Sequence, residues 1–252
     1  MLSLLLMVCM FGCATKAQTP AAPSSDDSEL TAEERFQKGS AFIESLIDVS
    51  KAEVQTDEED PGYLQRYWQF GGPADAANIP ETVTIDGKDI AIGQITVKQV
   101  KELGFTVDFD MDTVEPDTIL SFSIVDGTKA LLLTTAANTA DQSIPFDDAV
   151  IAGFSGSFSA YSMPFDYAGI TEASTLKDII AAFGLEAGEA VIGLVASTSD
   201  AEITVRISNT VQNGDTETIK SLDIYFLYSA LENTAAINGF LLNINVYPAD
   251  AD

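Results

Sequence analysis

The sequence TLKDIIAAFG, residues 175–184, sets the predicted architecture because it resembles TVKQVKELG at residues 96–104. Each stretch begins with a threonine, a favoured helix N-cap, and ends with a glycine, which favours the end of a helix. The apolar residues between these signals follow helical spacing. The sequence therefore predicts two short helices, which begin 79 residues apart.

Stretches that alternate between apolar and polar residues follow both predicted helices. In residues 105–111, FTVDFDM, every second side chain is apolar. This period of two is typical of antiparallel strands with one face in water. Further strands are predicted at residues 120–124, 130–133, 149–159, 203–207, 222–226 and 240–246. Asp-Gly pairs at residues 86–87 and 126–127 predict tight turns, the first within a hairpin over residues 82–92.

These elements predict an α+β fold, with an N-terminal amphipathic helix followed by two helix-plus-antiparallel-sheet units. The N-terminal helix is expected over residues 32–54, because Thr31 and Glu34 form a capping box before apolar residues at helical spacing. A helical segment is expected at residues 31–80, a first unit at 81–162 and a second at 163–252. In its order of elements the chain resembles the beta-lactamase inhibitory protein, and each unit is similar to small outer-membrane assembly lipoproteins.

The leader of the chain predicts its location. Residues 2–13 read LSLLLMVCMFGC, an uncharged run that is too short for a transmembrane helix of about 20 residues and is typical of a secretory signal at residues 1–12. Its end, Met10-Phe11-Gly12-Cys13, resembles the lipobox of bacterial lipoproteins. Gly12 and Cys13 fit that pattern, but Phe11 and Met10 are bulkier than usual and no basic residue precedes the run. Either the signal is atypical or the true start lies upstream.

The lipobox resemblance implies that Cys13 is lipidated and becomes the mature N-terminus. Residues 13–30, polar and containing proline, are then a disordered tether. The expected location is the extracytoplasmic face of the cell membrane, with the protein held by its lipid anchor. The alternative is an ordinary secretory signal cut nearby, in which Cys13 has no role.

Composition excludes several classes of function. The 252 residues include 39 acidic and 12 basic ones, for a net charge of −27. Nucleic-acid binding depends on neutralisation of phosphates by Lys and Arg, so nucleic acid is excluded as a partner. Histidine is absent, which excludes Ser-His and Cys-His catalysis and His-ligated zinc.

The densest aromatic segment is YLQRYWQF at residues 63–70, which contains the single tryptophan. Helical spacing would place Tyr63, Tyr67 and Phe70 on one face. We expect these aromatic residues either to pack against the domain or to form a stacking surface for a sugar or a partner protein. Tyr63, Tyr67 and Trp68 are the candidate ligand-binding residues.

Three aspartates at alternate positions are the candidate metal ligands. Asp108, Asp110 and Asp112 would project from one face of a strand about 6 to 7 Å apart. Oxygen ligands suit calcium, although Thr113 stands where an EF-hand loop has its glycine. A solvated strand face explains the same spacing without a metal. A glycosidase pair would also require one carboxyl group in an apolar pocket, for which the sequence gives no sign.

The sequence thus predicts a lipid-anchored binding protein that engages a partner protein or a glycan, without catalytic activity and without a cofactor. A chain that lacks histidine and any cluster of nucleophiles suits a docking role better than catalysis. Two alternatives stay open: an enzyme that acts on a glycan through carboxylates, and a calcium-dependent structural or adhesion module.

Overall fold

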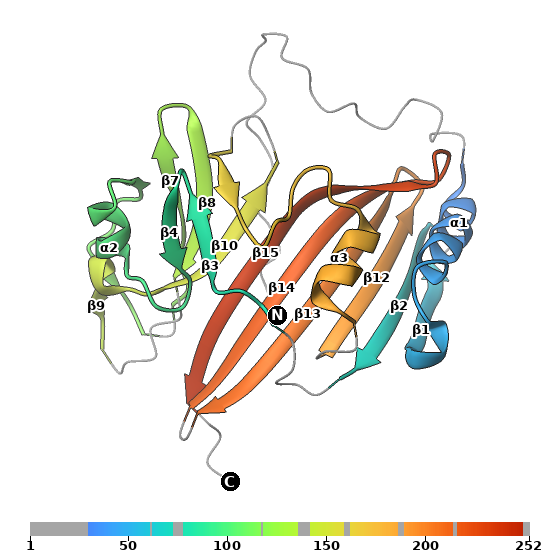
Figure 1. Cartoon of the computed structure of the whole chain (residues 1–252), viewed down its shortest axis with the longest axis horizontal. Helices are drawn as coiled ribbons and strands as arrows, with labels where there is room; N and C mark the ends of the chain where they lie inside the picture. Colours follow the sequence, from blue (N-terminus) through green and yellow to red (C-terminus); the bar gives the residue numbers. More distant parts are fainter. Residues whose placement is uncertain are drawn as a thin grey trace.

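A ten-stranded antiparallel sheet dominates the molecule in the computed structural model (Figure 1). The structure describes residues 30–60, 62–72, 78–116, 118–135, 142–158, 162–185, 189–213 and 216–248. The strands follow the order β1-β2-β12-β13-β14-β15-β10-β8-β7-β5 across the sheet. A three-stranded sheet, β11-β3-β4, and a two-stranded one, β6-β9, accompany it.

Strands supply most of the regular structure. They are β1 (Glu53–Asp60), β2 (Tyr63–Gly71), β3 (Thr82–Ile85), β4 (Lys88–Ala91), β5 (Thr106–Asp108), β6 (Thr113–Val114), β7 (Ser121–Asp126), β8 (Lys129–Thr135), β9 (Ile144–Pro145), β10 (Ile151–Ser157), β11 (Phe165–Asp166), β12 (Glu189–Ser197), β13 (Ala201–Asn213), β14 (Thr216–Ser229) and β15 (Thr234–Pro248). The described helices are α1 (Ala32–Glu44), α2 (Val97–Glu102) and α3 (Leu176–Phe183), with short 3-10 turns η2 (Val49–Lys51) and η3 (Phe146–Asp148).

One face of the large sheet carries the core, and we call it the covered face. A row of buried apolar side chains crosses it from strand to strand, because directly paired residues of antiparallel strands point to the same side. The row runs Phe122, Leu133, Phe154, Leu242, Leu222, Ile207, Ala190 and Phe70. Side chains of this parity therefore form the floor of the hydrophobic core.

Three structures pack on the covered face. Helix α1 lies on β2 and β12, where Gly39 comes so close that an added Cβ would lie 2.9 Å from Leu194 Cδ1. Helix α3 lies in front of the long central strands in Figure 1 and buries Leu176, Ile179 and Phe183. Strand β11 and its neighbours lie near β15, since the ring of Tyr167, just after β11, stacks on Phe240 with centroids 5.1 Å apart.

The opposite face of the sheet, which we call the open face, is formed by the side chains of the other parity. One of its rows spans all ten strands and mixes polar and apolar residues. It runs Asp108, Ser123, Leu132, Ser155, Leu241, Asp223, Arg206, Val191, Gln69 and Glu53. Most of these residues are exposed or half-buried, in contrast to the apolar row on the covered face.

The predicted fold class is wrong, because the protein is mostly β and its strands do not form two helix-plus-sheet units. Strand β2 pairs with β12, and β10 pairs with β15, so the late strands β12 to β15 lie between earlier strands on both sides within one sheet. The capping box of Thr31 and Glu34 is present, but the helix ends at Glu44 and not near Val54. Residues 53–71, expected to be largely helical, form the β1–β2 hairpin because β12 offers a long edge for pairing.

Several local predictions are confirmed. Thr96 and Thr175 each cap a short helix with a capping box, α2 and α3 respectively. The hairpin around Asp86-Gly87 is strands β3 and β4, and Asp126-Gly127 joins β7 to β8. These features depend on residues close in sequence, so they were predicted correctly, whereas the pairing of strands far apart in sequence was not.

Candidate binding surface

The structure separates the three aromatic residues proposed from the sequence. All three lie on β2, where alternate side chains point to opposite faces. Trp68 points into the core and has no exposed surface, whereas Tyr63 and Tyr67 lie on the open face, 46% and 37% exposed. A helical arrangement of Tyr63, Tyr67 and Phe70 is therefore wrong, and Trp68 is not positioned to contact a ligand.

An ion pair lies near the middle of the open face. Arg206 of β13 donates from Nε to Asp223 Oδ1 of β14 across 2.6 Å. The Asp223 side chain is only 6% exposed, while that of Arg206 is 59% exposed. The carboxylate raises the pKa of Arg206 by hydrogen bonding and by its charge. The exposed side of the guanidinium can therefore bind an outside partner while Asp223 holds it in place.

Tyr225 lies close to this ion pair, and Glu202 lies four residues from Arg206 along β13. Burial raises the pKa of Tyr225, and the charge of Asp223 raises it further. Burial also raises the pKa of Glu202, with a contribution from Asp200. Glu202 and Tyr225 are half-buried on the open face, so the surrounding side chains already exclude part of the water around them.

Apolar side chains flank the polar centre. Tyr67 lies over Gly193 of β12, where an added Cβ would lie 3.3 Å from two ring carbons. Exposed or half-buried aliphatic side chains on the same face are Val191, Val195, Leu227, Leu241 and Leu132. Leu227 and Leu132 are 41% and 38% exposed. The open face is therefore amphipathic, whereas a purely solvated face would carry mainly polar residues.

The charges on the open face are arranged asymmetrically. Arg206 is the one basic residue on the part of this face that the structure describes. Acidic residues lie toward its edges, at Glu53 and Asp57 on β1, Glu189 on β12 and Asp108 on β5. The face thus combines exposed tyrosine, aliphatic and arginine side chains with acidic ones: Asp223 pairs with Arg206 near the middle, Glu202 lies four residues from Arg206 along β13, and the others lie toward the edges.

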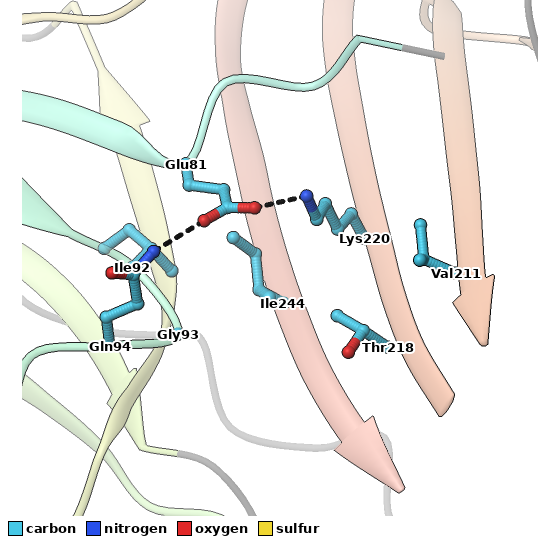
Figure 2. A pocket seen from close by; sticks show the side chains of 8 residues that line it. All are labelled: Glu81, Ile92, Gly93, Gln94, Val211, Thr218, Lys220 and Ile244. Carbon is cyan, nitrogen blue, oxygen red and sulfur yellow. Dashed lines mark hydrogen bonds and ion pairs between the residues drawn. The ribbon is translucent and has the colours of Figure 1, made fainter. Parts of the chain in front are cut away.

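A hollow of about 220 Å³ lies on the covered face of the large sheet, between strands β13 to β15 and the residues next to β3 and β4 of the three-stranded sheet (Figure 2). The Glu81 carboxylate accepts hydrogen bonds from Lys220 Nζ on β14 and, over 2.8 Å, from Gln94 Nε2. Lys220 and Gln94 hold the pKa of Glu81 below its ordinary value, Lys220 having the larger effect. The remaining lining residues are Ile92, Gly93, Val211, Thr218 and Ile244.

The candidate metal ligands do not converge in the structure. Asp108 ends β5, and Asp110 and Asp112 follow it in an exposed irregular segment. Within the described ranges, no group of three or more acidic, cysteine or histidine residues is placed to hold a metal ion. A calcium site at Asp108, Asp110 and Asp112 stays a prediction, to which this geometry adds no support.

The signal, the tether and Cys13 lie outside the described residues. Among the residues that are described, no helix has the length and apolar character needed to cross a membrane.

Sequence reasoning missed Glu81, Glu202, Arg206, Lys220 and Asp223. Pairing of the consecutive strands β13 and β14 brings Arg206 to Asp223, and packing of the three-stranded sheet on the large one brings Glu81 to Lys220, 139 residues away in sequence. Alternation in β13, with Glu202, Thr204 and Arg206 between apolar residues, gave the available signal that these side chains share one face.

Comparison of the chain with protein-family models, with curated proteins and with solved structures gives no match.

Proposed function

We propose that the protein is a non-catalytic binding lipoprotein, anchored through Cys13 outside the cytoplasm, that docks a partner protein on the open face. The observation that carries this proposal is the amphipathic character of the open face, on which Tyr63, Tyr67 and Leu227 stay exposed together with Arg206. Tyrosine and arginine are enriched in the centres of protein interfaces, and lysine is depleted.

The size of the open face suits such an interface. Ten strands about 4.8 Å apart extend over about 43 Å, and five rows about 7 Å apart on the longer strands cover about 28 Å. The resulting area is sufficient for a standard interface, which buries about 800 Å² on each partner. The acidic periphery favours a partner with basic residues around an apolar or aromatic centre.

A glycan is the second candidate for the open face. Tyr63 and Tyr67 can stack on sugar rings, and Gln65 between them offers an amide for hydrogen bonds. We favour a protein because aliphatic side chains such as Val195 and Leu227 contribute little to recognition of hydroxyl-rich sugars. The glycan is therefore an outcome of the experiment below.

The enzyme alternative requires two carboxyl groups close together in a pocket with opposed pKa shifts. Among the described residues that line the hollow of Figure 2, Glu81 is the one carboxylate. On the open face, Glu202 and Asp223 are separated by four residues along the strand and one strand across, about 14 Å, beyond the separation in glycosidases. Asp200 is near enough to contribute to the raised pKa of Glu202, but neither residue lines the hollow of Figure 2. These distances support a binding role.

The experiment is site-specific photo-crosslinking in the native host. A photoreactive phenylalanine analogue is placed at Tyr67 on the open face and, as the matched control, at Lys38 on the exposed side of α1. We expect a discrete protein adduct from position 67 and none from position 38. The adduct partner is then purified and its affinity measured for the wild type, Tyr67→Ala, Leu227→Ser and the control Lys177→Ala.

Loss of an aromatic anchor from an interface costs about 2 kcal/mol, so Tyr67→Ala should weaken binding by about thirtyfold. Lys177→Ala, on the opposite side of the sheet, should leave the affinity unchanged. Adducts from position 38 alone, or equal affinity of all variants, would refute docking on this face. Retention by a neutral polysaccharide gel that Tyr67→Ala abolishes, without a protein adduct, would replace the protein with a glycan.

Lipid attachment is tested separately. Mass spectrometry of protein from the native host should find Cys13 as the N-terminal residue with a diacylglycerol group in thioether linkage to its sulfur. An unmodified Cys13 within an intact chain would refute the anchor and leave the docking experiment unaffected.

A further inference from the structure

The hollow of Figure 2 collects polar groups of both signs at one place. The Glu81 carboxylate lies between Lys220 on the long strand and Gln94 on the small-sheet side, and Thr218 lies farther along β14. Ile92 and Ile244 form buried apolar walls, and Val211 is half-buried. An apolar surface with a few converging polar groups is the general form of a small-molecule site.

The charges of this hollow select against ligands with a single charge. A simple cation would meet Lys220, and a simple anion would meet Glu81 within a chain of net charge −27. A ligand with one positive and one negative group finds a complementary partner for each. It also carries no net charge for the field of the protein to repel.

The volume limits the size of the ligand. About 220 Å³ lies below the roughly 300 to 1,000 Å³ of sites for drug-sized molecules. About seven water molecules occupy the same volume in liquid water. The occupant is therefore small, and the isoleucine walls require that part of it is apolar.

We propose that this hollow binds a free apolar L-α-amino acid. The ligand's ammonium group donates to Glu81, its carboxylate accepts from Lys220, and its side chain packs on the apolar lining at Val211 and Ile244. Binding opens the Glu81–Lys220 ion pair and forms two ion pairs in its place. The existing pair is part-exposed, at 31% for Glu81 and 19% for Lys220, so it can open at modest cost.

This site is independent of the open face, because Lys220 and Ile244 are paired residues on the covered side of the sheet. Its failure would therefore leave the proposed docking function standing, and the reverse also holds.

The test is isothermal titration calorimetry on the folded full chain with L-leucine at millimolar concentration. Two leucine analogues serve as matched probes: isopentylamine lacks the carboxylate, and 4-methylpentanoate lacks the ammonium group. We expect leucine to bind and each analogue to bind at least tenfold more weakly, since each loses charged hydrogen bonds. Glycine, without an apolar side chain, should also bind at least tenfold more weakly.

Variants locate the site. Glu81→Gln and Lys220→Met should each weaken leucine binding at least tenfold, while the exposed substitutions Glu172→Gln and Lys177→Met should not change it. Absence of leucine binding to the wild type would overturn the proposal. So would equal binding of the amine or the acid, or equal binding by the two hollow variants. The analogue series uses the wild type, so the test stands even where a variant fails to fold.

Discussion

Adjacent residues on β2 should differ sharply in their contribution to stability. Trp68 is fully buried between β1 and β12, where it pairs with Val54 and Ile192, and the Arg66 guanidinium lies 6.0 Å from its ring centroid. Truncation of a buried aromatic side chain costs about 3 to 5 kcal/mol. We therefore expect Trp68→Ala to lower the free energy of unfolding by about 4 kcal/mol.

Tyr67 precedes Trp68 but lies on the open face with 37% of its surface exposed. Its contacts are the backbone at Gly193 and a hydrogen bond to Gln65. Substitutions at such sites cost about 1 kcal/mol or less, so Tyr67→Ala should lower stability by about that amount. The difference between these two losses of stability arises because successive side chains of a strand point to opposite faces of the sheet.

The assay is urea unfolding followed by far-ultraviolet circular dichroism, because Trp68 is the only tryptophan and its loss removes the fluorescence signal. With a urea dependence of about 2 to 3 kcal/mol/M, Trp68→Ala should lower the midpoint by about 1.5 M and Tyr67→Ala by less than about 0.5 M. Tyr67→Phe, which keeps the ring, is the matched control. Equal losses at positions 67 and 68, or a larger loss at 67, would refute the assignment of these faces.

Four further predictions test other parts of the structure. Gly156→Ala should lower the free energy of unfolding by about 1 to 3 kcal/mol, because the new Cβ would lie 2.5 Å from Phe240 Cε1. The control Gly71→Ala, which has open space at its Cβ, should change it little, and equal effects of the two in urea unfolding would contradict this packing. Thr175→Ala should cost about 1 kcal/mol by removing the N-cap of α3, and an unchanged urea midpoint would argue against that cap. The Glu81–Lys220 pair depresses the pKa of Glu81, so the stabilisation from this pair is present above the ordinary pKa of 4.5 and is lost as the pH falls through the lower pKa of the folded state. The difference in Tm between wild type and Glu81→Gln should therefore shrink as the pH falls through that range. A difference that grows there would contradict the depressed pKa of Glu81. Millimolar calcium should leave Tm unchanged, because Asp108, Asp110 and Asp112 do not converge, and a rise that Asp110→Ala abolishes would restore the calcium module.

The sequence predicted features that depend on neighbouring residues. The threonine caps of the three helices involve side chains three positions apart, and the Asp-Gly turns involve adjacent residues. The alternation in β13, β14 and β15 also marked those strands, since each has one buried face. These signals are local, so they are readable without knowledge of the partners.

The overall sheet depended on pairings that leave little local signal. Strand β2 lies on one side of the long strands and β10 on the other, each with partners more than 80 residues away in sequence. In β2, Tyr63, Tyr67 and Phe70 have the spacing of one helical face, and Tyr67 and Trp68 are adjacent, so the aromatic pattern does not distinguish a strand from a helix. Residues such as Asp223 and Lys220 likewise gained their roles through contacts formed only on folding.

The open face exists only if β2 and β12 are neighbours with Gln65 opposite Val195. Paired cysteines at these two positions test this directly, since antiparallel partners lie about 4.5 to 5.5 Å apart and can form a disulfide. We predict that Gln65→Cys with Val195→Cys cross-links on mild oxidation, as found by mass spectrometry of the digested protein. Gln65→Cys with Ala196→Cys, whose side chains point to opposite faces, should not. Absence of the first cross-link, or equal formation of both, would contradict a single ten-stranded sheet with one open face.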